Sequence, residues 1–399
     1  SNLGDTQMRH AKSGQWWENE GQRALANNSV AYKFKPDMDT FMREWLSLYE
    51  SKSGERGIFN RQSAIKQASK NGRRDVEQEF GCNPCSEIIL RPYQFCNLTE
   101  VVVRESDTEE TLIQKVKLAT ILGTYQSTLT DFKYLRKIWK DNTEEERLLG
   151  VSLTGIMDSA LLSGKSPRIG QNIEGLLTKL RETAVETNRK VSAKLGIPQS
   201  TAVTTVKPSG TVSQLVDSAS GIHARHNPHY IRTVRGDNKD PLTQFMVAQG
   251  IPSEPDVMKP QSTTVFSFPM QAPSTAVFRQ DMSAIEQLNM WLKYQKYWCE
   301  HKPSVTISVK EHEWLDVGSW VYKNFDEVSG ISFLPFSEHT YKQAPYQDCT
   351  EVEYKTMLSK MPKGIDWTAL SEFEKEDTTS GSRDLACTAG VCEVVDISA

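Results

Sequence analysis

Two short stretches carry the most informative residues of this chain: Gly81-Cys82-Asn83-Pro84-Cys85-Ser86-Glu87 and Phe95-Cys96-Asn97-Leu98. Cys85 has a carboxamide two residues before it, in Asn83, and a carboxylate two residues after it, in Glu87. Alternate residues of an extended segment point to the same side, so Asn83, Cys85 and Glu87 can face one ligand. The stretch therefore offers a reactive sulfur, a base and a hydrogen-bonding amide, and Cys96 adds a second sulfur that can close a disulfide.

The composition is that of an ordinary globular chain of 399 residues, 38 % hydrophobic and 25 % charged, with a formal net charge of −4. This balance argues against an extended nucleic-acid surface. No apolar run reaches the length of a membrane span, and no secretory signal opens the chain, so we expect a cytoplasmic protein without a membrane partner. Seven cysteines are too few for a disulfide scaffold, and their number is odd.

Strand-like and helix-like segments alternate over most of the length, which predicts an α/β architecture with a mainly parallel sheet. Helices are expected after Pro36 and over 108–139 and 171–196, and Leu112, Val116 and Leu122 are expected on one face of the second helix. The segment 61–80 reads as an exposed helix or loop. Strands are expected at 28–32, 57–60, 98–103, 148–157, 203–206, 263–268, 304–309 and 331–334.

Cys82 and Cys85 also form a Cys-x-x-Cys motif, which is typical of two other kinds of site. A zinc site needs two further ligands; Cys96 and a histidine can serve, but the chain has no second paired motif. A thioredoxin-like redox motif should open a helix after a strand, whereas Arg91-Pro92 interrupts the segment that follows Cys85. Both alternatives stay open on the residues alone.

The loop resembles the active-site finger loop of ribonucleotide reductases, through Asn83-Pro84-Cys85, Glu87 and Cys96-Asn97-Leu98. The eleven-residue gap between Cys85 and Cys96 resembles that of the adenosylcobalamin-dependent class II enzymes. The segments 91–101 and 148–158 are similar to the monomeric ribonucleoside-triphosphate reductase branch. This resemblance implies the second half of a ten-stranded α/β barrel with a catalytic finger loop, and adenosylcobalamin as the cofactor.

The resemblance also implies roles for the loop residues. Cys85 is the expected thiyl-radical site, which abstracts the 3′ hydrogen of the ribose. Glu87 is the expected general base for the 3′-hydroxyl proton, and Asn83 is expected to bind the ribose hydroxyls. Cys96 is expected to be one of the two thiols that reduce C2′ and end as a disulfide. The expected substrates are ribonucleoside triphosphates, and no side-chain metal site is expected.

The second thiol of that reducing pair is expected upstream, yet no cysteine precedes Cys82. The chain also opens at Ser1, with its first methionine at Met8. These two observations predict the C-terminal portion of a longer reductase, which needs an N-terminal half as a partner.

Cys387 and Cys392 lie in an acidic segment rich in Ser, Thr and Gly, which predicts a flexible redox-active tail over 372–399. Cysteines in such a tail can reach an active-site disulfide and reduce it by thiol–disulfide exchange. The resemblance implies the same role, with thioredoxin or a similar dithiol protein as the external reductant.

A phosphate-binding loop is expected at Pro208-Ser209-Gly210-Thr211, which follows a short apolar strand and precedes a helix start. Backbone N–H groups at such a position favour an anion, and glycine permits its close approach. The resemblance implies that this loop holds the substrate phosphates, with Lys207 as a possible helper.

The expected domain organisation is an N-terminal part over 1–80, the finger loop and half-barrel over 81–371, and the tail over 372–399. Two rival functions remain. A glycyl-radical or oxygen-dependent reductase lacks support, because neither a glycyl-radical motif nor an adjacent tyrosine pair is present. A zinc- or disulfide-stabilised binding module without radical chemistry is the alternative from another class.

Overall fold

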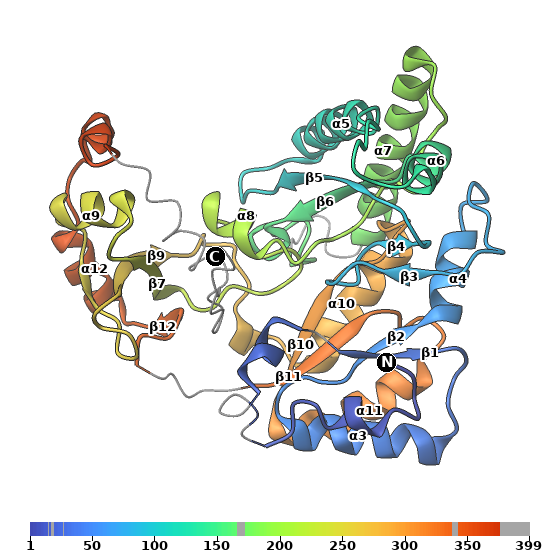
Figure 1. The fold of residues 1–399 in the computed structure, drawn as a ribbon, viewed down its shortest axis with the longest axis horizontal. Helices are drawn as coiled ribbons and strands as arrows, with labels where there is room; N and C mark the ends of the chain where they lie inside the picture. Colours follow the sequence, from blue (N-terminus) through green and yellow to red (C-terminus); the bar gives the residue numbers. More distant parts are fainter. Residues whose placement is uncertain (15, 17–19, 27, 166–171, 337–341, 376–399) are drawn as a thin grey trace, which may run out of the picture. The chain divides into compact units, whose positions relative to one another are not determined.

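The computed structural model describes residues 1–14, 16, 20–26, 28–165, 172–336 and 342–375 of the chain. The fold divides into two compact units (Figure 1). Unit 1 consists of Ser1–Ser13, Asn28–Arg225 and Pro273–Phe336, and unit 2 consists of Gly14–Asn27, His226–Ala272 and Ser337–Ala399. The residues that concern function at the sequence level lie in unit 1, apart from the tail cysteines.

Unit 1 contains a four-stranded sheet in the order β1-β2-β11-β10. Its strands are β1 (Ser29–Tyr32), β2 (Gly57–Asn60), β10 (Val305–Val309) and β11 (Ile331–Pro335). The pairs β1–β2 and β10–β11 are parallel, whereas β2 meets β11 in the antiparallel sense.

A second parallel pair, β5 (Asn97–Val102) and β6 (Leu149–Thr154), continues this arrangement. An isolated bridge joins Val151 of β6 to Thr204, and another joins Val206 to Pro303, just before β10. The pairings therefore run from β5 through β6 and the 204–206 segment to the four-stranded sheet. This arc of strands is open, with β5 at one end and β1 at the other.

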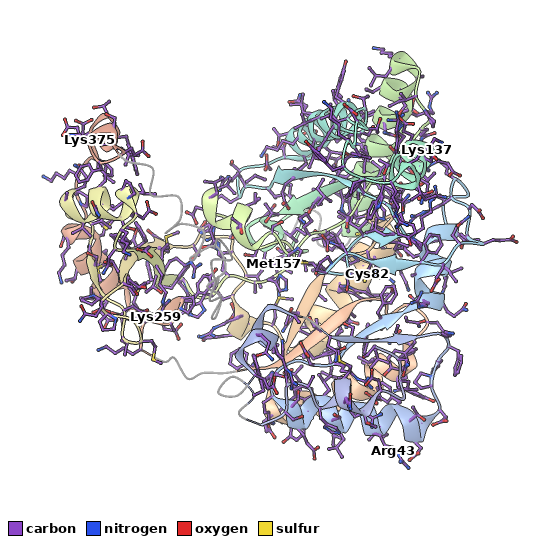
Figure 2. The ribbon with its side chains drawn as sticks, viewed as in Figure 1. Arg43, Cys82, Lys137, Met157, Lys259 and Lys375 are labelled. Carbon is purple, nitrogen blue, oxygen red and sulfur yellow. The ribbon has the colours of Figure 1, made fainter. Side chains whose placement is uncertain are left out.

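The helices of unit 1 bury apolar faces against these strands. In α3 (Met38–Ser51), Asp37 caps the N-terminus by accepting a hydrogen bond from the Thr40 N–H, and Phe41 and Trp45 are buried. Arg43 projects from the opposite, solvent-facing side of this helix (Figure 2). The helix α7 ends at Gly196, whose φ of 67° suits a residue without a Cβ.

The other elements of unit 1 are α1 (Thr6–Arg9), α4 (Arg61–Ser69), β3 (Gly81–Cys82), β4 (Ile89–Leu90), α5 (Glu109–Gln126), α6 (Lys137–Glu146), η2 (Ile156–Asp158), α7 (Ile173–Leu195), α8 (Gly210–Leu215), η3 (Arg279–Asp281), α10 (Ala284–Tyr297), η4 (Glu311–Glu313) and α11 (Trp314–Lys323).

Unit 2 is built on an antiparallel sheet in the order β12-β7-β9-β8. Its elements are η1 (Gly21–Leu25), β7 (His229–Asp237), α9 (Pro241–Ala248), β8 (Ser253–Pro255), β9 (Thr263–Gln271), β12 (Tyr346–Asp348), α12 (Glu351–Lys360) and η5 (Trp367–Glu372). In this unit Phe245 of α9 packs its ring against Trp367 and Phe373.

The α/β architecture is confirmed, but the expectation of a mainly parallel sheet is wrong, because unit 2 is antiparallel and unit 1 is mixed. The helix expected over 108–139 ends at Gln126, where Thr128, Thr130 and Asp131 follow, which are weak helix formers. Residues 203–206 form only isolated bridges. Among the described residues, no helix combines the length and apolar content needed to cross a bilayer.

One burial expectation is also wrong. The segment 61–80 is not wholly exposed, because α4 buries Ala64 and Gln67 and the loop after it buries Arg74. In α5, Leu112 and Val116 are buried, whereas Leu122 is 63 % exposed. The periodicity places these residues on neighbouring faces, and only the tertiary packing decides which face is covered.

Candidate active site

The finger loop (residues 81–96) begins as a short antiparallel pair, in which β3 and β4 place Gly81 opposite Leu90 and Cys82 opposite Ile89. Between these strands the chain turns. The Ser86 N–H donates to the Asn83 carbonyl at 2.9 Å, and Ser86 has a φ of 64°. The tip of the loop is therefore a turn, and not the extended segment expected to align Asn83, Cys85 and Glu87 on one side. Cys85 is exposed, whereas Glu87 is fully buried.

The base of the finger loop is anchored by a buried ion pair. Both carboxylate oxygens of Glu146 accept from the Arg74 guanidinium at 2.9 Å, and Arg74 also donates to the Ile89 carbonyl at 2.9 Å. Gln94 joins the same network through Glu146 and the Arg91 N–H. Because both charges are paired and hydrogen-bonded inside the protein, this network fixes where the loop leaves the sheet.

His301 provides a second anchor for β4. Its Nδ1 accepts from the Ile89 N–H at 3.3 Å, and its Nε2 lies 2.9 Å from the Leu149 carbonyl oxygen. Burial lowers the pKa of His301 to about 3, so the ring is neutral at ordinary pH. A neutral ring that accepts at Nδ1 and donates at Nε2 satisfies both contacts.

Glu87 is held rigidly and keeps one acceptor atom unused. Its carbonyl oxygen accepts from the Lys302 N–H at 3.0 Å and from the Thr205 hydroxyl at 3.3 Å. Oε1 lies 3.2 Å from Lys207 Nζ, while no described residue donates to Oε2. A buried carboxylate oxygen without a donor is costly, and it is the arrangement expected where a ligand hydroxyl completes the site.

Two thiols of the loop, those of Cys85 and Cys96, have raised pKa values, which favour their uncharged forms. Partial burial raises the pKa of the Cys85 thiol; the Glu87 carboxylate raises it further and Lys207 lowers it. Burial also raises the pKa of the Cys96 thiol strongly, against the nearby positive charges of Arg74 and Lys207. Glu87 and Lys207 act on both thiols, so the fold brings Cys85, Glu87 and Cys96 into one electrostatic neighbourhood.

The expected phosphate loop lies beside a carboxylate. Ser209 is in the left-handed region with a φ of 54°, is buried, and donates its hydroxyl to Glu100 Oε1, which also accepts from the Ser152 hydroxyl at 2.9 Å. Burial raises the pKa of Glu100, although both hydroxyls act against that shift. The helix that follows, α8, has only six residues. Sequence reasoning missed Glu100, which sits in a strand pattern that reads as purely structural.

Lys302 is a further group that the sequence did not single out. Its side chain is fully buried, no described residue accepts from Nζ, and Nζ lies 4.6 Å from the centre of the Phe59 ring. Burial lowers the pKa of Lys302 to about 8, with Cys82 and Glu87 acting against the shift. Gly330, with a φ of 86°, allows this approach, because a Cβ there would lie 3.0 Å from Nζ and 2.6 Å from the Ser86 Cβ.

The Cys82 side chain packs inside the protein. Its sulfur lies 3.5 Å from the Ser86 hydroxyl, and the side chain packs against a small core that includes Phe59, Phe80 and Ile89. Cys82 is labelled on unit 1 in Figure 2. Within the described residues, no three His, Cys, Asp or Glu side chains are grouped closely enough to hold a metal ion, and all described cysteines are unpaired. Cys387 and Cys392 lie outside the described residues.

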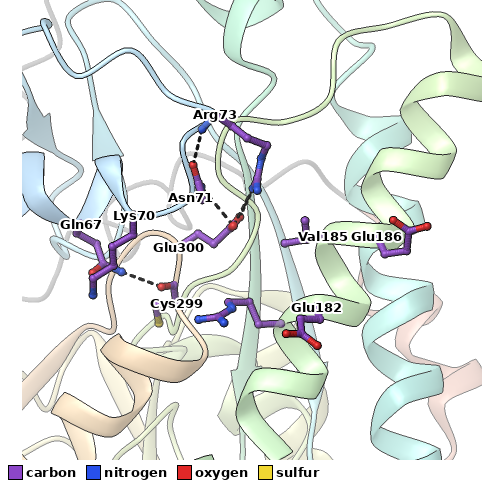
Figure 3. A pocket seen from close by; sticks show the side chains of 10 residues that line it. Gln67, Lys70, Asn71, Arg73, Glu182, Val185, Glu186, Cys299 and Glu300 are labelled. Carbon is purple, nitrogen blue, oxygen red and sulfur yellow. Dashed lines mark hydrogen bonds and ion pairs between the residues drawn. The ribbon is translucent and has the colours of Figure 1, made fainter. Parts of the chain in front are cut away.

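A separate polar pocket of about 420 Å³ lies between the end of α4, α7 and the Cys299-Glu300 segment (Figure 3). Arg73 contacts both oxygens of Glu300 at 2.7 Å, and Asn71 donates to Glu300 Oε1 at 3.2 Å. Its charged side chains largely neutralise one another, and none of the loop residues lines it. It is not the site of the expected chemistry.

Comparison with known proteins gives a consistent picture. No protein-family model matches the chain. The adenosylcobalamin-dependent ribonucleoside-triphosphate reductase of Lacticaseibacillus paracasei is 27 % identical over 411 residues, which cover 93 % of this chain and 53 % of that protein. The reductase of the same description from Euglena gracilis is 27 % identical over 302 residues, covering 74 % of this chain and 40 % of its own length. This chain spans about half the length of the curated relatives that it matches.

Solved structures agree. A B12-dependent class II ribonucleotide reductase matches 93 % of this chain and 54 % of its own, with a TM-score of 0.75 at 24 % identity. The class Id alpha subunit of Actinobacillus ureae matches 78 % of this chain and 65 % of its own, with a TM-score of 0.52 at 14 % identity. The fold is thus that of a ribonucleotide reductase catalytic chain. The sequence relatives are, more narrowly, adenosylcobalamin-dependent ribonucleoside-triphosphate reductases, which confirms the resemblance read from the finger loop.

Proposed function

We propose that this chain is the finger-loop portion of a ribonucleotide reductase and reduces ribonucleoside triphosphates to 2′-deoxyribonucleotides. One observation carries the proposal. The carboxylate of Glu87, two residues from the exposed Cys85 thiol, is fully buried, with Oε1 on Lys207 and Oε2 without a donor among the described residues. In this proposal a ribose hydroxyl becomes the missing donor to Oε2, and the Cys85 thiol acts on the carbon that carries it.

The residues then have separate tasks. A thiyl radical on Cys85 removes the 3′ hydrogen atom, and Glu87 accepts the 3′-hydroxyl proton. Asn83 binds hydroxyls through its NH₂ group, because its Oδ1 already accepts from the Ile88 N–H at 3.0 Å. The C2′–OH bond breaks and water leaves, while Cys96 and a second thiol are oxidised to a disulfide, which supplies the two electrons of the reduction. Cys85 then returns the hydrogen atom to C3′, which restores the thiyl radical.

The site suits adenosylcobalamin, the cofactor that names the relatives. When bound, this cofactor supplies the initial radical through homolysis of its cobalt–carbon bond. Cys85 is the residue that would meet it, since its sulfur is exposed and its raised pKa keeps the thiol protonated, as hydrogen-atom donation requires.

The remaining parts of the proposal concern partners and organisation. Pro208, Ser209, Gly210 and Thr211 are proposed to hold the substrate phosphates. Cys387 and Cys392 are proposed to reduce the Cys96 disulfide, with thioredoxin or a similar dithiol protein as the external reductant. A polypeptide that supplies the front half of the reductase is proposed to complete the ten-stranded barrel. The division at residues 80 and 371 and a cytoplasmic location also remain predictions.

The test is nucleotide reduction by the chain together with its front half, adenosylcobalamin, dithiothreitol and CTP. We expect Cys85→Ser and Glu87→Gln to abolish dCTP formation without lowering the thermal unfolding midpoint of the C85S variant, since Cys85 is exposed. The matched control is Cys349→Ser in unit 2, which should keep full activity. Wild-type turnover by C85S would overturn the proposed function.

A further inference from the structure

Glu100 fixes the start of the expected phosphate loop at two points. It lies in β5 directly opposite Ser152 of β6. Its Oε1 accepts from the Ser209 hydroxyl and, at 2.9 Å, from the Ser152 hydroxyl. Ser152 Oγ in turn accepts from the Lys207 N–H at 2.9 Å. One carboxylate oxygen therefore holds the loop directly at Ser209 and, through one hydroxyl, at Lys207.

The two oxygens of the Glu100 carboxyl group have different surroundings. Both hydroxyls donate to Oε1, and no described residue donates to Oε2. The side chain also lines a groove of about 610 Å³ between β5 and α5, so a proton can reach it from solvent. A protonated carboxyl group still accepts through its other oxygen. A proton on Oε2 therefore costs neither of the two hydrogen bonds that hold the loop.

The charged groups near Glu100 are few and of both signs. Burial raises its pKa, the two hydroxyls and Lys207 act against that shift, and the Glu87 carboxylate acts with it. Both β6 and the N-cap of α8 face Glu100 with hydroxyl groups, and α5 contributes the Tyr125 phenol to the same groove. Because its pKa is already raised, the carboxyl group responds to any further negative charge nearby.

A phosphate group on this loop brings such a charge. The loop would bind an anion through backbone N–H groups that follow Ser209, whose hydroxyl contacts Glu100. An ionised Glu100 repels that anion, whereas a protonated Glu100 does not. Binding of the anion and protonation of Glu100 therefore favour each other.

We propose that Glu100 positions the phosphate loop and takes up a proton from solvent when the phosphates of the substrate bind there. The proton forms an O–H bond at Oε2, while Oε1 keeps the Ser209 and Ser152 hydroxyls. This proposal rests on the proposed function, which assigns the phosphates to residues 208–211. It makes the affinity for the triphosphate group depend on pH, with tighter binding on the acid side.

The experiment measures the binding of inorganic tripolyphosphate to the whole chain, without ribose or cofactor. Calorimetry in buffers of different ionisation enthalpy gives the number of protons taken up per ligand. Wild type is compared with Glu100→Gln, which keeps an acceptor at Oε1 but cannot take up the proton. The control is Glu110→Gln, which removes an exposed carboxylate from α5. Ionisation of tripolyphosphate itself is common to the three proteins and cancels in the comparison.

Wild type and E110Q should take up more protons than E100Q, by up to about one proton per ligand. From about pH 5 to about pH 8 the affinity of wild type should fall at least about tenfold relative to that of E100Q, because a tenfold change corresponds to one pKa unit. Equal proton uptake by wild type and E100Q, with both binding the ligand, overturns the inference alone.

Infrared difference spectra test wild type directly, even if E100Q does not fold. Adding tripolyphosphate near the pH of largest uptake should convert a carboxylate band into the C=O band of a protonated carboxyl group. Binding without that band overturns the inference. If wild type binds no tripolyphosphate at any pH, the assignment of phosphates to residues 208–211 is wrong, and the inference falls with it. The loss of dCTP formation in C85S tests the radical chemistry separately.

Discussion

Lys207 Nζ lies 3.2 Å from Glu87 Oε1, so a cation just before the expected phosphate loop meets the carboxylate of the finger loop, 120 residues away in the sequence. Glu87 is fully buried in this contact, while the Lys207 side chain keeps about a quarter of its exposure. The pair joins the two segments that the proposed reaction needs, one for the ribose and one for its phosphates.

Removing the Lys207 cation should destabilise the folded chain, because it leaves the buried Glu87 carboxylate unpaired. We expect Lys207→Met to lower the free energy of unfolding by about 2 kcal/mol, less than for a fully buried pair because Lys207 is partly hydrated. Adding Glu87→Gln should recover part of the loss, and a double-mutant cycle in urea measures the coupling. The control is Lys355→Met, whose pair with Glu351 is exposed and should contribute little to stability. Strictly additive single effects would contradict the coupling.

Glu100 should make stability depend on pH. Burial raises its pKa above the ordinary value of 4.5, so the folded chain holds this proton more tightly than the unfolded chain. The contribution of Glu100 to stability is therefore largest at low pH and falls as the pH rises through the raised pKa. In Glu100→Gln this dependence is absent, and the stability of E100Q relative to wild type should increase from pH 4.5 upward. Urea unfolding at a series of pH values measures the difference, and parallel curves would argue against it.

We expect the buried charge of Lys302 to lower the stability of the folded chain. Its pKa is lowered from 10.5 to about 8 by burial, so below pH 8 the folded chain carries an unfavourable buried charge. We expect Lys302→Met to be more stable than wild type at neutral pH by an amount on the order of 3 kcal/mol. The advantage should shrink as the pH rises from about 8 to 10.5, where wild-type Lys302 releases its proton.

The control for this prediction is Lys133→Met, at a lysine whose side chain is 73 % exposed. The difference in stability between K133M and wild type should be small and independent of pH. If K302M were less stable than wild type at pH 7, a hidden partner for the ammonium group would have to be sought.

The thiols should differ in their rates of alkylation. Iodoacetamide reacts with the thiolate, so both access and pKa set the rate. Cys85 is exposed, whereas Cys96 is partly covered and its pKa is raised strongly by burial. At pH 8 we expect Cys85 to be labelled first, Cys96 at least about tenfold more slowly, and the buried Cys299 last. Mass spectrometry of tryptic peptides gives the order, and labelling of Cys96 ahead of Cys85 would refute it.

The sequence predicted helix boundaries well where the signal lies within a few residues of the boundary. The helix after Pro36 begins at an Asp37 cap, and the helix over 171–196 ends at Gly196, because caps and glycines act within a few residues. The antiparallel sheet of unit 2 was missed, since strand direction depends on which segments pair and leaves little local signal.

For the candidate site, the reactive groups can be read from the chain alone: the order Asn83, Cys85, Glu87 and the gap to Cys96. Tertiary structure alone decided the surroundings of these groups. Lys207, Glu100, Arg74 and the adjacent residues His301 and Lys302 come from four separate segments, and nothing in their local sequence shows that folding gathers them around one loop. Burial and charge act through space, so the electrostatics of Glu87 and Cys96 are set by neighbours that only the fold can bring near.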